Sequence, residues 1–210
     1  DGYAAITAMG LERKGLGAIL GNYLMGINPL DIELVNQRIQ EFSYIGMRNG
    51  WIDAAFWDII GKARGEPLWK VLGGTGGYVY PYLSTGSNHG HDQAIVREIS
   101  QQTAEQGYRG LKLRVKSEDI GKMVDFIGAA RDAVGDDLDL MVDANQGWPV
   151  DLLDETPKWS YQTALAFASG IEAFDVKWLE EPLNRGNFAG LAKLRRNTKT
   201  PIAGGELNSS

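Results

Sequence analysis

The chain has 210 residues, of which 43% are hydrophobic, so it is long enough to bury one large core or two small ones. Its net charge of −6, with no block of basic residues, argues against nucleic acid or an anionic membrane surface as the main partner. The absence of cysteine excludes disulfides and thiolate chemistry and fits a cytoplasmic location, and no apolar run approaches the roughly 20 residues of a membrane helix.

Residues 29–72 are predicted to form helices. Apolar residues recur near helical spacing after Asn28-Pro29, which would serve as N-cap and first turn. A second amphipathic pattern follows, and Gly65 and Pro67 interrupt it before a last short turn. "GGTGG" at 73–77 is interpreted as a linker, since no helix pattern follows it at the spacing that a phosphate loop needs.

After residue 77 short apolar strands alternate with helical patterns. The predicted strands are 78–84, 110–115, 138–144, 175–181 and 201–206, and the predicted helices lie near 91–106, 118–134, 158–173 and 187–197. This alternation favours a parallel sheet, closed as a barrel or open and doubly wound. Five strands would make a little over half of an eight-stranded barrel.

Acidic residues follow three consecutive strands of this predicted sheet. Asp143 lies in "VDANQ", Glu180 in "LEEP" and Glu206 in "GGE". The carboxyl ends of parallel strands meet at one rim, where carboxylates repel each other unless a cation lies between them. Oxygen ligands of this kind suit Mg²⁺. The alternative is that the three acids only cap helices; Glu181, one residue past Glu180, should face the other way and pair or cap.

Two cations and an amide accompany the acids. Lys112 and Arg114 are two residues apart on the second predicted strand, so both side chains point to the same face. Asn145, two residues past Asp143, is expected to donate a hydrogen bond to a substrate or to a water bound to the metal. Ser84, at the end of the first strand, and His89, in the loop after it, are further candidates for substrate binding.

The segments "GLKLR", "MVDANQGW", "WLEEPL" and "PIAGGE", in this order, resemble the mandelate racemase/muconate lactonizing branch of the enolase superfamily. The stretch "GWIDAAFWDIIGKARGEPLWKVLGG" resembles the helical part of the capping domain in that family. The resemblance implies an α/β fold: a partial (β/α) TIM-type barrel with its first five strands in 78–210, preceded by the C-terminal helical part of an α+β capping domain in 1–77.

The resemblance also implies a chemistry. Asp143, Glu180 and Glu206 would bind Mg²⁺, and the substrate would be a small carboxylic acid that loses its α-proton to give a metal-stabilised enediolate. Lys112 would be the electrostatic partner of the substrate carboxylate. Relatives of this kind imply a homo-oligomer for the full-length protein.

The chain departs from the family pattern at Arg114. Many relatives carry a second lysine there as the general base, whereas arginine holds its proton and is a poor base. It could still bind a carboxylate or a substrate hydroxyl. The usual substitute in the family is a His–Asp pair on strands that would follow Ser210. The two histidines of this chain, His89 and His91, lie in a loop where histidines are more often solvated than catalytic.

One-base chemistry favours a Mg²⁺-dependent dehydratase of a sugar acid. A racemase, epimerase or cycloisomerase of the same superfamily is the alternative. A different possibility is an inactive truncated fragment, whose unpaired strand edges would invite association. A Schiff-base aldolase that uses Lys112 fits less well, because it would not need three carboxylates.

Overall fold

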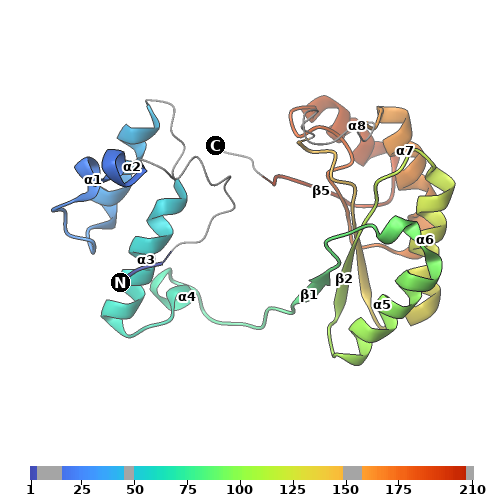
Figure 1. The fold of residues 1–210 in the computed structure, drawn as a ribbon, viewed down its shortest axis with the longest axis horizontal. Helices are drawn as coiled ribbons and strands as arrows, with labels where there is room; N and C mark the ends of the chain where they lie inside the picture. The colour runs from blue at the N-terminus through green and yellow to red at the C-terminus, as the bar shows by residue number, and fades with distance from the viewer. Residues whose placement is uncertain (4–15, 45–49, 149–157, 207–210) are drawn as a thin grey trace. The chain divides into compact units, whose positions relative to one another are not determined.

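The computed structural model describes residues 1–3, 16–44, 50–148 and 158–206. Contacts within the chain divide it into two compact units, Asp1–Tyr78 and Val79–Ser210 (Figure 1). The first unit is helical and the second is built of alternating strands and helices. That the first unit is the helical part of a capping domain stays a prediction.

The first unit contains four α-helices among its described residues: α1 (Leu16–Leu24), α2 (Ile32–Ser43), α3 (Asp53–Arg64) and α4 (Leu68–Val71). Helix α1 lies outside the predicted helical region. The N-cap of α2 is Asp31, whose carboxylate accepts a hydrogen bond from the backbone N–H of Leu34, and not Asn28 as predicted. Asn28 instead accepts from Leu30 and closes the turn before the helix. Gly65 ends α3 in the left-handed conformation, at a φ of 63°.

The second unit contains five parallel strands: β1 (Tyr82–Ser84), β2 (Gly110–Arg114), β3 (Asp139–Asp143), β4 (Leu179–Glu180) and β5 (Ile202–Ala203). They pair in the order β1-β2-β3-β4-β5. A doubly wound sheet would reverse its strand order, so this sequential order is that of a barrel segment. Strand β1 is shorter than the predicted 78–84 and begins after Pro81, which has no N–H to donate.

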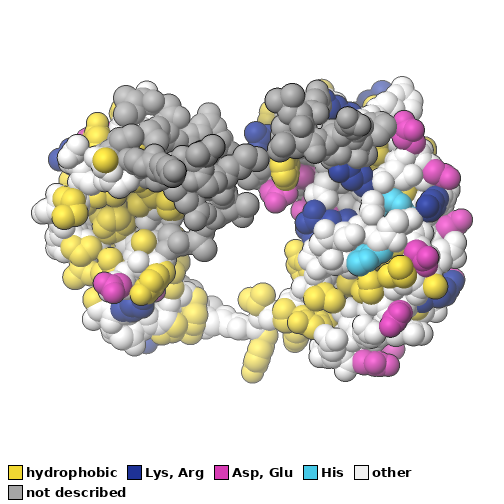
Figure 2. All heavy atoms as spheres, in the orientation of Figure 1, with side chains coloured by type: hydrophobic (Ala, Val, Ile, Leu, Met, Phe, Trp, Pro, Cys, Tyr) yellow, Lys and Arg dark blue, Asp and Glu magenta, His cyan; other side chains and the backbone are white. Residues whose placement is uncertain are grey.

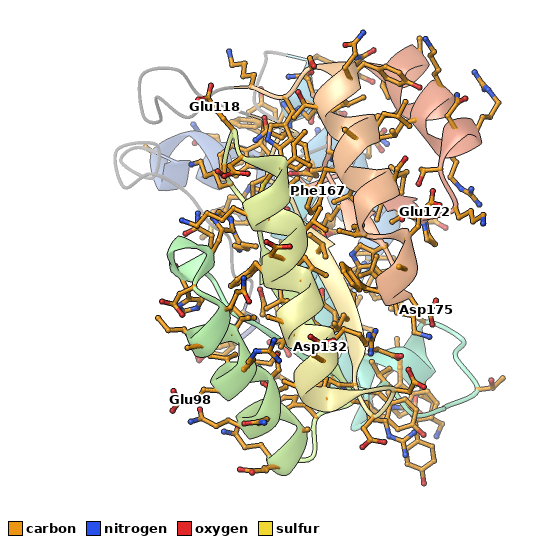
Figure 3. The ribbon with its side chains drawn as sticks, turned by 90° about the vertical axis from the view of Figure 1, so that its right-hand side faces the viewer. Glu98, Glu118, Asp132, Phe167, Glu172 and Asp175 are labelled. Carbon is orange, nitrogen blue, oxygen red and sulfur yellow. The ribbon has the colours of Figure 1, made fainter. Side chains whose placement is uncertain are left out.

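Four helices cover one face of the sheet: α5 (Gln93–Glu105), α6 (Ile120–Val134), α7 (Tyr161–Gly170) and α8 (Phe188–Asn197) (Figure 1). Figure 3 looks onto this helical layer, with α5, α6 and α7 side by side. Each helix begins at a side chain that accepts a hydrogen bond from its first turn; the caps are Asp92, Asp119, Ser160 and Asn187. Each such cap is worth about 1 kcal/mol.

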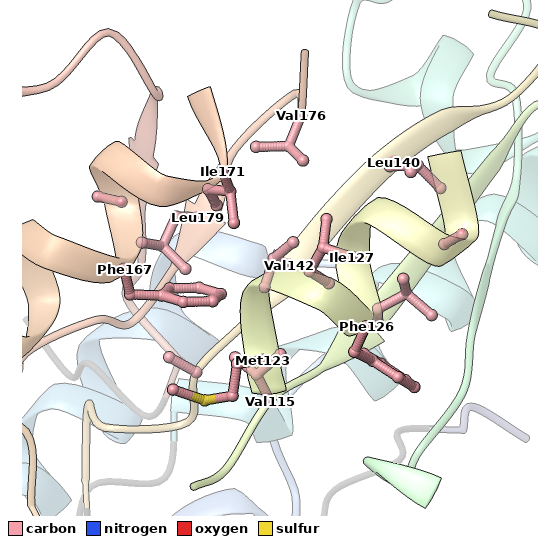
Figure 4. Packing of buried hydrophobic residues seen from close by; sticks show 14 of the residues in the cluster. Val115, Met123, Phe126, Ile127, Leu140, Val142, Phe167, Ile171, Val176 and Leu179 are labelled. Atoms are coloured by element: carbon pink, nitrogen blue, oxygen red, sulfur yellow. The ribbon is translucent and has the colours of Figure 1, made fainter. Parts of the chain in front are cut away.

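The core of this unit lies between the sheet and the helices (Figure 4). Side chains alternate along a strand, and Leu113, Val142 and Leu179 point toward the helices with no exposed area. There they meet Ile127 and Phe167 of the helical layer, which are also fully buried. Burial of each such side chain contributes about 1.5–3 kcal/mol. The alternate positions on the same strands therefore face the other side of the sheet, and they include every charged residue of β2, β3 and β4.

The surface of the second unit carries charges of both signs. On the face shown in Figure 2, Lys and Arg side chains are interspersed with Asp and Glu over this unit. Within the ranges that the structure describes, no helix combines the length and the apolar character that crossing a membrane requires.

Candidate active site

The strand register brings the polar strand ends to one level. Arg114 of β2 is paired with Asp143 of β3, and Asp143 is paired with Glu180 of β4. Glu180 is in turn paired with Ala203 of β5, three residues before Glu206. Because the strands are parallel, the four strand ends lie along one edge of the sheet. This is the edge at which the sequence predicted the site.

Lys112 forms the centre of the cluster. Its ammonium lies 3.1 and 3.2 Å from the two carboxylate oxygens of Glu180 and 3.2 Å from Oδ2 of Asp143. Burial disfavours the ammonium form, but the hydrogen bond to Glu180 and the charge of Asp143 outweigh it and raise the pKa of Lys112. A lysine held protonated is a hydrogen-bond donor and a positive charge, and it is poorly suited to Schiff-base chemistry.

Arg114 and Asn145 form a second polar pair beside Lys112. The guanidinium donates a hydrogen bond of 2.9 Å to Oδ1 of Asn145. The backbone N–H of Asn145 donates to Oδ1 of Asp143, also at 2.9 Å, and Asn145 has a positive φ of 49°. The Nε of Arg114 is buried with no hydrogen-bond partner among the described residues. The pair thus retains a donor that an oxygen of a substrate could satisfy.

Two tryptophans donate hydrogen bonds to Glu180 and Glu206, two of the three predicted metal ligands. The indole N–H of Trp178 donates to Glu180 at 3.1 Å, and its ring packs edge-on against Tyr82 with the centroids 5.9 Å apart. The indole N–H of Trp148 donates to Glu206, also at 3.1 Å. Neither contact was predicted from the sequence. Only the spacing of two residues between Trp178 and Glu180, which puts them on one face of the strand, could have indicated the first.

The described residues contain no group of three or more His, Asp and Glu side chains placed to hold one metal ion. Asp143 and Glu180 lie around the ammonium of Lys112, and Glu206 is bound to Trp148. The donor chemistry nevertheless fits Mg²⁺: every candidate ligand is a carboxylate, and with Glu181 the acids outnumber the two cations Lys112 and Arg114. The assignment of Asp143, Glu180 and Glu206 as ligands stays a prediction.

Glu181 differs from what the sequence suggested. It was expected to pair or cap, yet it is only 2% exposed and neither of its carboxylate oxygens has a hydrogen-bond partner among the described residues. Its φ is 48°, so the strand alternation that predicted its direction ends at Glu180. Burial raises the pKa of Glu181, and the charges of Asp143, Glu206 and Glu180 raise it further. The backbone N–H of Glu206 opposes this shift without reaching hydrogen-bonding geometry.

The candidates after β1 separate into two kinds. Ser84 is exposed and lies beside Lys112 in the strand register. His89 is half-buried, and its Nε2 has no partner among the described residues. His91 is not solvated as expected: it is 5% exposed, its Nε2 accepts from the backbone N–H of Lys116 at 3.1 Å, and it packs edge-on against Phe126. Burial lowers the pKa of His91, as does the charge of Lys122.

Residues 94–210 match the family described as enolase C-terminal domain-like, and the chain belongs to that family within the enolase superfamily. It is 31% identical over its whole length to L-talarate/galactarate dehydratase of Salmonella typhimurium, covering 53% of that protein. Over 74% of its length it is 33% identical to 3,6-anhydro-alpha-L-galactonate cycloisomerase of Streptomyces coelicolor, covering 40%. Racemases are also among its relatives.

The fold agrees with these relatives. The whole chain superposes on 58% of L-talarate dehydratase from Polaromonas sp. JS666, solved with Mg and L-glucarate, with a TM-score of 0.84 and 28% identity. The five parallel strands thus align to part of the enolase barrel domain, as predicted. The chain spans about half the length of the curated relatives that it matches.

Proposed function

We propose that the protein is a Mg²⁺-dependent dehydratase of a sugar acid. The observation that carries the proposal is the position of Lys112, a protonated amine within 3.2 Å of both Asp143 and Glu180 at the carboxyl edge of the sheet. A substrate carboxylate bound there would gain a charged hydrogen-bond donor next to predicted metal ligands. The match to L-talarate/galactarate dehydratase, which spans this whole chain and 53% of that protein, supports the substrate class.

Each residue of the cluster has a role in this proposal. Asp143, Glu180 and Glu206 would hold Mg²⁺, which when bound supplies positive charge beside the substrate carboxylate. Lys112 would donate to that carboxylate, and the interaction strengthens as negative charge develops during loss of the α-proton. Arg114 and Asn145 would bind hydroxyl oxygens of the substrate, with Ser84 and His89 as further contacts from the loop after β1.

The reaction requires one base and one leaving group. A base removes the α-proton, the electron pair of that C–H bond forms a carbon–carbon double bond, and the β-hydroxyl leaves as water after it gains a proton. The resulting enol rearranges to a 2-keto-3-deoxy acid. By the family resemblance, Arg114 stands where many relatives carry a second lysine as base, which favours this one-base sequence over racemisation by two bases.

A cycloisomerase, racemase or epimerase is the second candidate, favoured by the 33% identity to a cycloisomerase. The two candidates share proton abstraction but differ in product. A dehydratase releases a 2-keto-3-deoxy acid, whereas a racemase or epimerase exchanges the α-proton with solvent and retains the β-hydroxyl.

The test is incubation of the full-length protein with Mg²⁺ and a panel of aldonic and aldaric acids. Formation of 2-keto-3-deoxy acids, abolished by Asp143→Asn and retained by the surface variant Asp139→Asn, would support the dehydratase. Exchange of the α-proton in D₂O without these products would favour the second candidate. If neither occurs, the proposal fails. Association of the 210-residue chain itself in light scattering, unaltered by Mg²⁺, would support the inactive fragment instead.

A further inference from the structure

Glu181 occupies an unusual place in the second unit. Its carboxylate lies against Gly147, in the segment that follows Asp143: a Cβ atom built on Gly147 would come within 2.4 Å of the carboxyl carbon. The Cγ of Glu181 lies near Gly204, two residues before Glu206, at 3.6 Å from a Cβ built there. The Glu181 side chain is therefore packed against the segments that carry two of the predicted metal ligands, and it is adjacent in sequence to the third.

Within the described residues, no hydrogen bond compensates the burial of the Glu181 carboxylate. Neither oxygen of Glu181 has a hydrogen-bond partner among the described residues, and its backbone is in the left-handed region that non-glycine residues avoid. Glu181 borders a cavity of about 290 Å³ that Arg185 and Arg195 also line. Neither guanidinium donates a hydrogen bond to the Glu181 carboxylate. Its electrostatic neighbours are the carboxylates of Asp143, Glu180 and Glu206. Backbone strain of this kind clusters at functional sites, and a buried carboxylate without a partner is destabilising, so a bound cation would offset the cost of burying Glu181.

We propose that Glu181 is a fourth acidic residue of the divalent-cation site, which supplies negative charge that strengthens cation binding. The inference rests on the proposed function, since it takes the cation to be bound at Asp143, Glu180 and Glu206. In this role Glu181 is an electrostatic partner of the ion. Gly147 and Gly204, which have no side chains, leave the room that the Glu181 side chain occupies. No pairing or capping role is left for it within the described residues.

The test compares Mg²⁺ binding by isothermal titration calorimetry and thermal unfolding without metal, in the full-length protein and in Glu181→Gln. The amide has the shape of the carboxyl group but no charge. We expect Mg²⁺ to bind at least tenfold more weakly, while the unfolding temperature without metal stays equal or rises. Glu181→Asp keeps the charge and should recover part of the affinity. Asp139→Asn, which removes a charge at the opposite end of β3, should change affinity less than twofold.

Two results would overturn the inference. One is Mg²⁺ affinity in Glu181→Gln within twofold of the Asp139→Asn control. The other is a lower unfolding temperature in the metal-free variant, which would show that the carboxylate stabilises the fold itself. These results are separate from failure of the proposed function, in which the unaltered protein would bind no Mg²⁺ in the same titration.

Discussion

The ammonium of Lys112 lies within 3.2 Å of both carboxylate oxygens of Glu180, although the two residues are 68 positions apart in the sequence. They belong to β2 and β4, and β3 lies between these strands. The contact passes beside the buried Asp143 and so joins the ends of three strands into one cluster. Lys112 forms ion pairs with both Asp143 and Glu180, which has consequences for stability.

Replacement of Lys112 by Met should destabilise the metal-free protein. The variant leaves Asp143, which is 1% exposed, without its ion pair, and breaking such a buried pair costs about 3 kcal/mol. Because Asp143 and Glu180 then lack the ammonium that pairs with both of them, Mg²⁺ should raise the unfolding temperature more in the variant than in the unaltered protein. Urea unfolding with and without Mg²⁺ measures both effects. An unchanged free energy of unfolding without metal would show that the pair does not stabilise the fold.

Replacement of Arg114 by Met should weaken substrate binding. Loss of the guanidinium removes the 2.9 Å contact with Asn145 and the unpartnered Nε, so kcat/KM should fall about 10–100-fold, mainly through a higher KM. Steady-state kinetics on the best substrate of the panel measure this, with Arg97→Met, a surface residue paired with Asp132, as the control. Complete loss of α-proton exchange with an unchanged KM would instead identify Arg114 as essential to proton transfer.

Replacement of Trp178 by Phe should leave the Glu180 carboxylate less firmly positioned and so weaken Mg²⁺ binding. The ring contact with Tyr82 can persist, while the indole N–H that donates to Glu180 at 3.1 Å is lost. A hydrogen bond to a charged group contributes about 1.5–3 kcal/mol, so we expect Mg²⁺ to bind about tenfold more weakly. Trp148→Phe, which removes the equivalent bond to Glu206, should weaken binding in the same way if both acids are ligands. Unaltered Mg²⁺ affinity in both variants would contradict this role for the indoles.

His91 should make stability depend on pH. Its pKa is lowered in the folded protein because the ring is buried and lies near the charge of Lys122. The unfolded chain, with a histidine pKa of about 6.5, therefore binds the proton more tightly, so stability falls as the pH decreases below about 6.5. Gln at position 91 can still accept from Lys116 but does not titrate. Thermal unfolding from pH 7.5 to 5 should show a smaller decline for His91→Gln; equal declines would exclude His91 as the cause.

Much of the second unit follows from local patterns. Alternation of apolar residues and strand–helix succession predicted all five strands, and the polar strand ends predicted which edge carries Lys112, Asp143 and Glu180. These features depend on strand periodicity, which a single sequence shows directly. The helix cap at Asp31 was misplaced by three residues because Asn28 and Asp31 can both cap, and only the backbone distinguishes them.

The features that sequence could not predict depend on how separate segments approach each other. Glu181 was misjudged because its left-handed backbone ends the alternation of β4, and nothing local requires that conformation. The bond from Trp148 to Glu206 joins segments 58 residues apart. The burial of His91 depends on Phe126 of α6. In each case the deciding contact is tertiary.

The most direct test of the central claim is a crystal structure of the full-length protein with Mn²⁺ in place of Mg²⁺, since the anomalous scattering of manganese locates the ion. We predict one ion at the carboxyl edge of the sheet, in contact with oxygens of Asp143, Glu180 and Glu206, with Lys112 displaced toward the substrate position. An ion bound elsewhere, or Lys112 still between Asp143 and Glu180 at saturating Mn²⁺, would contradict the account.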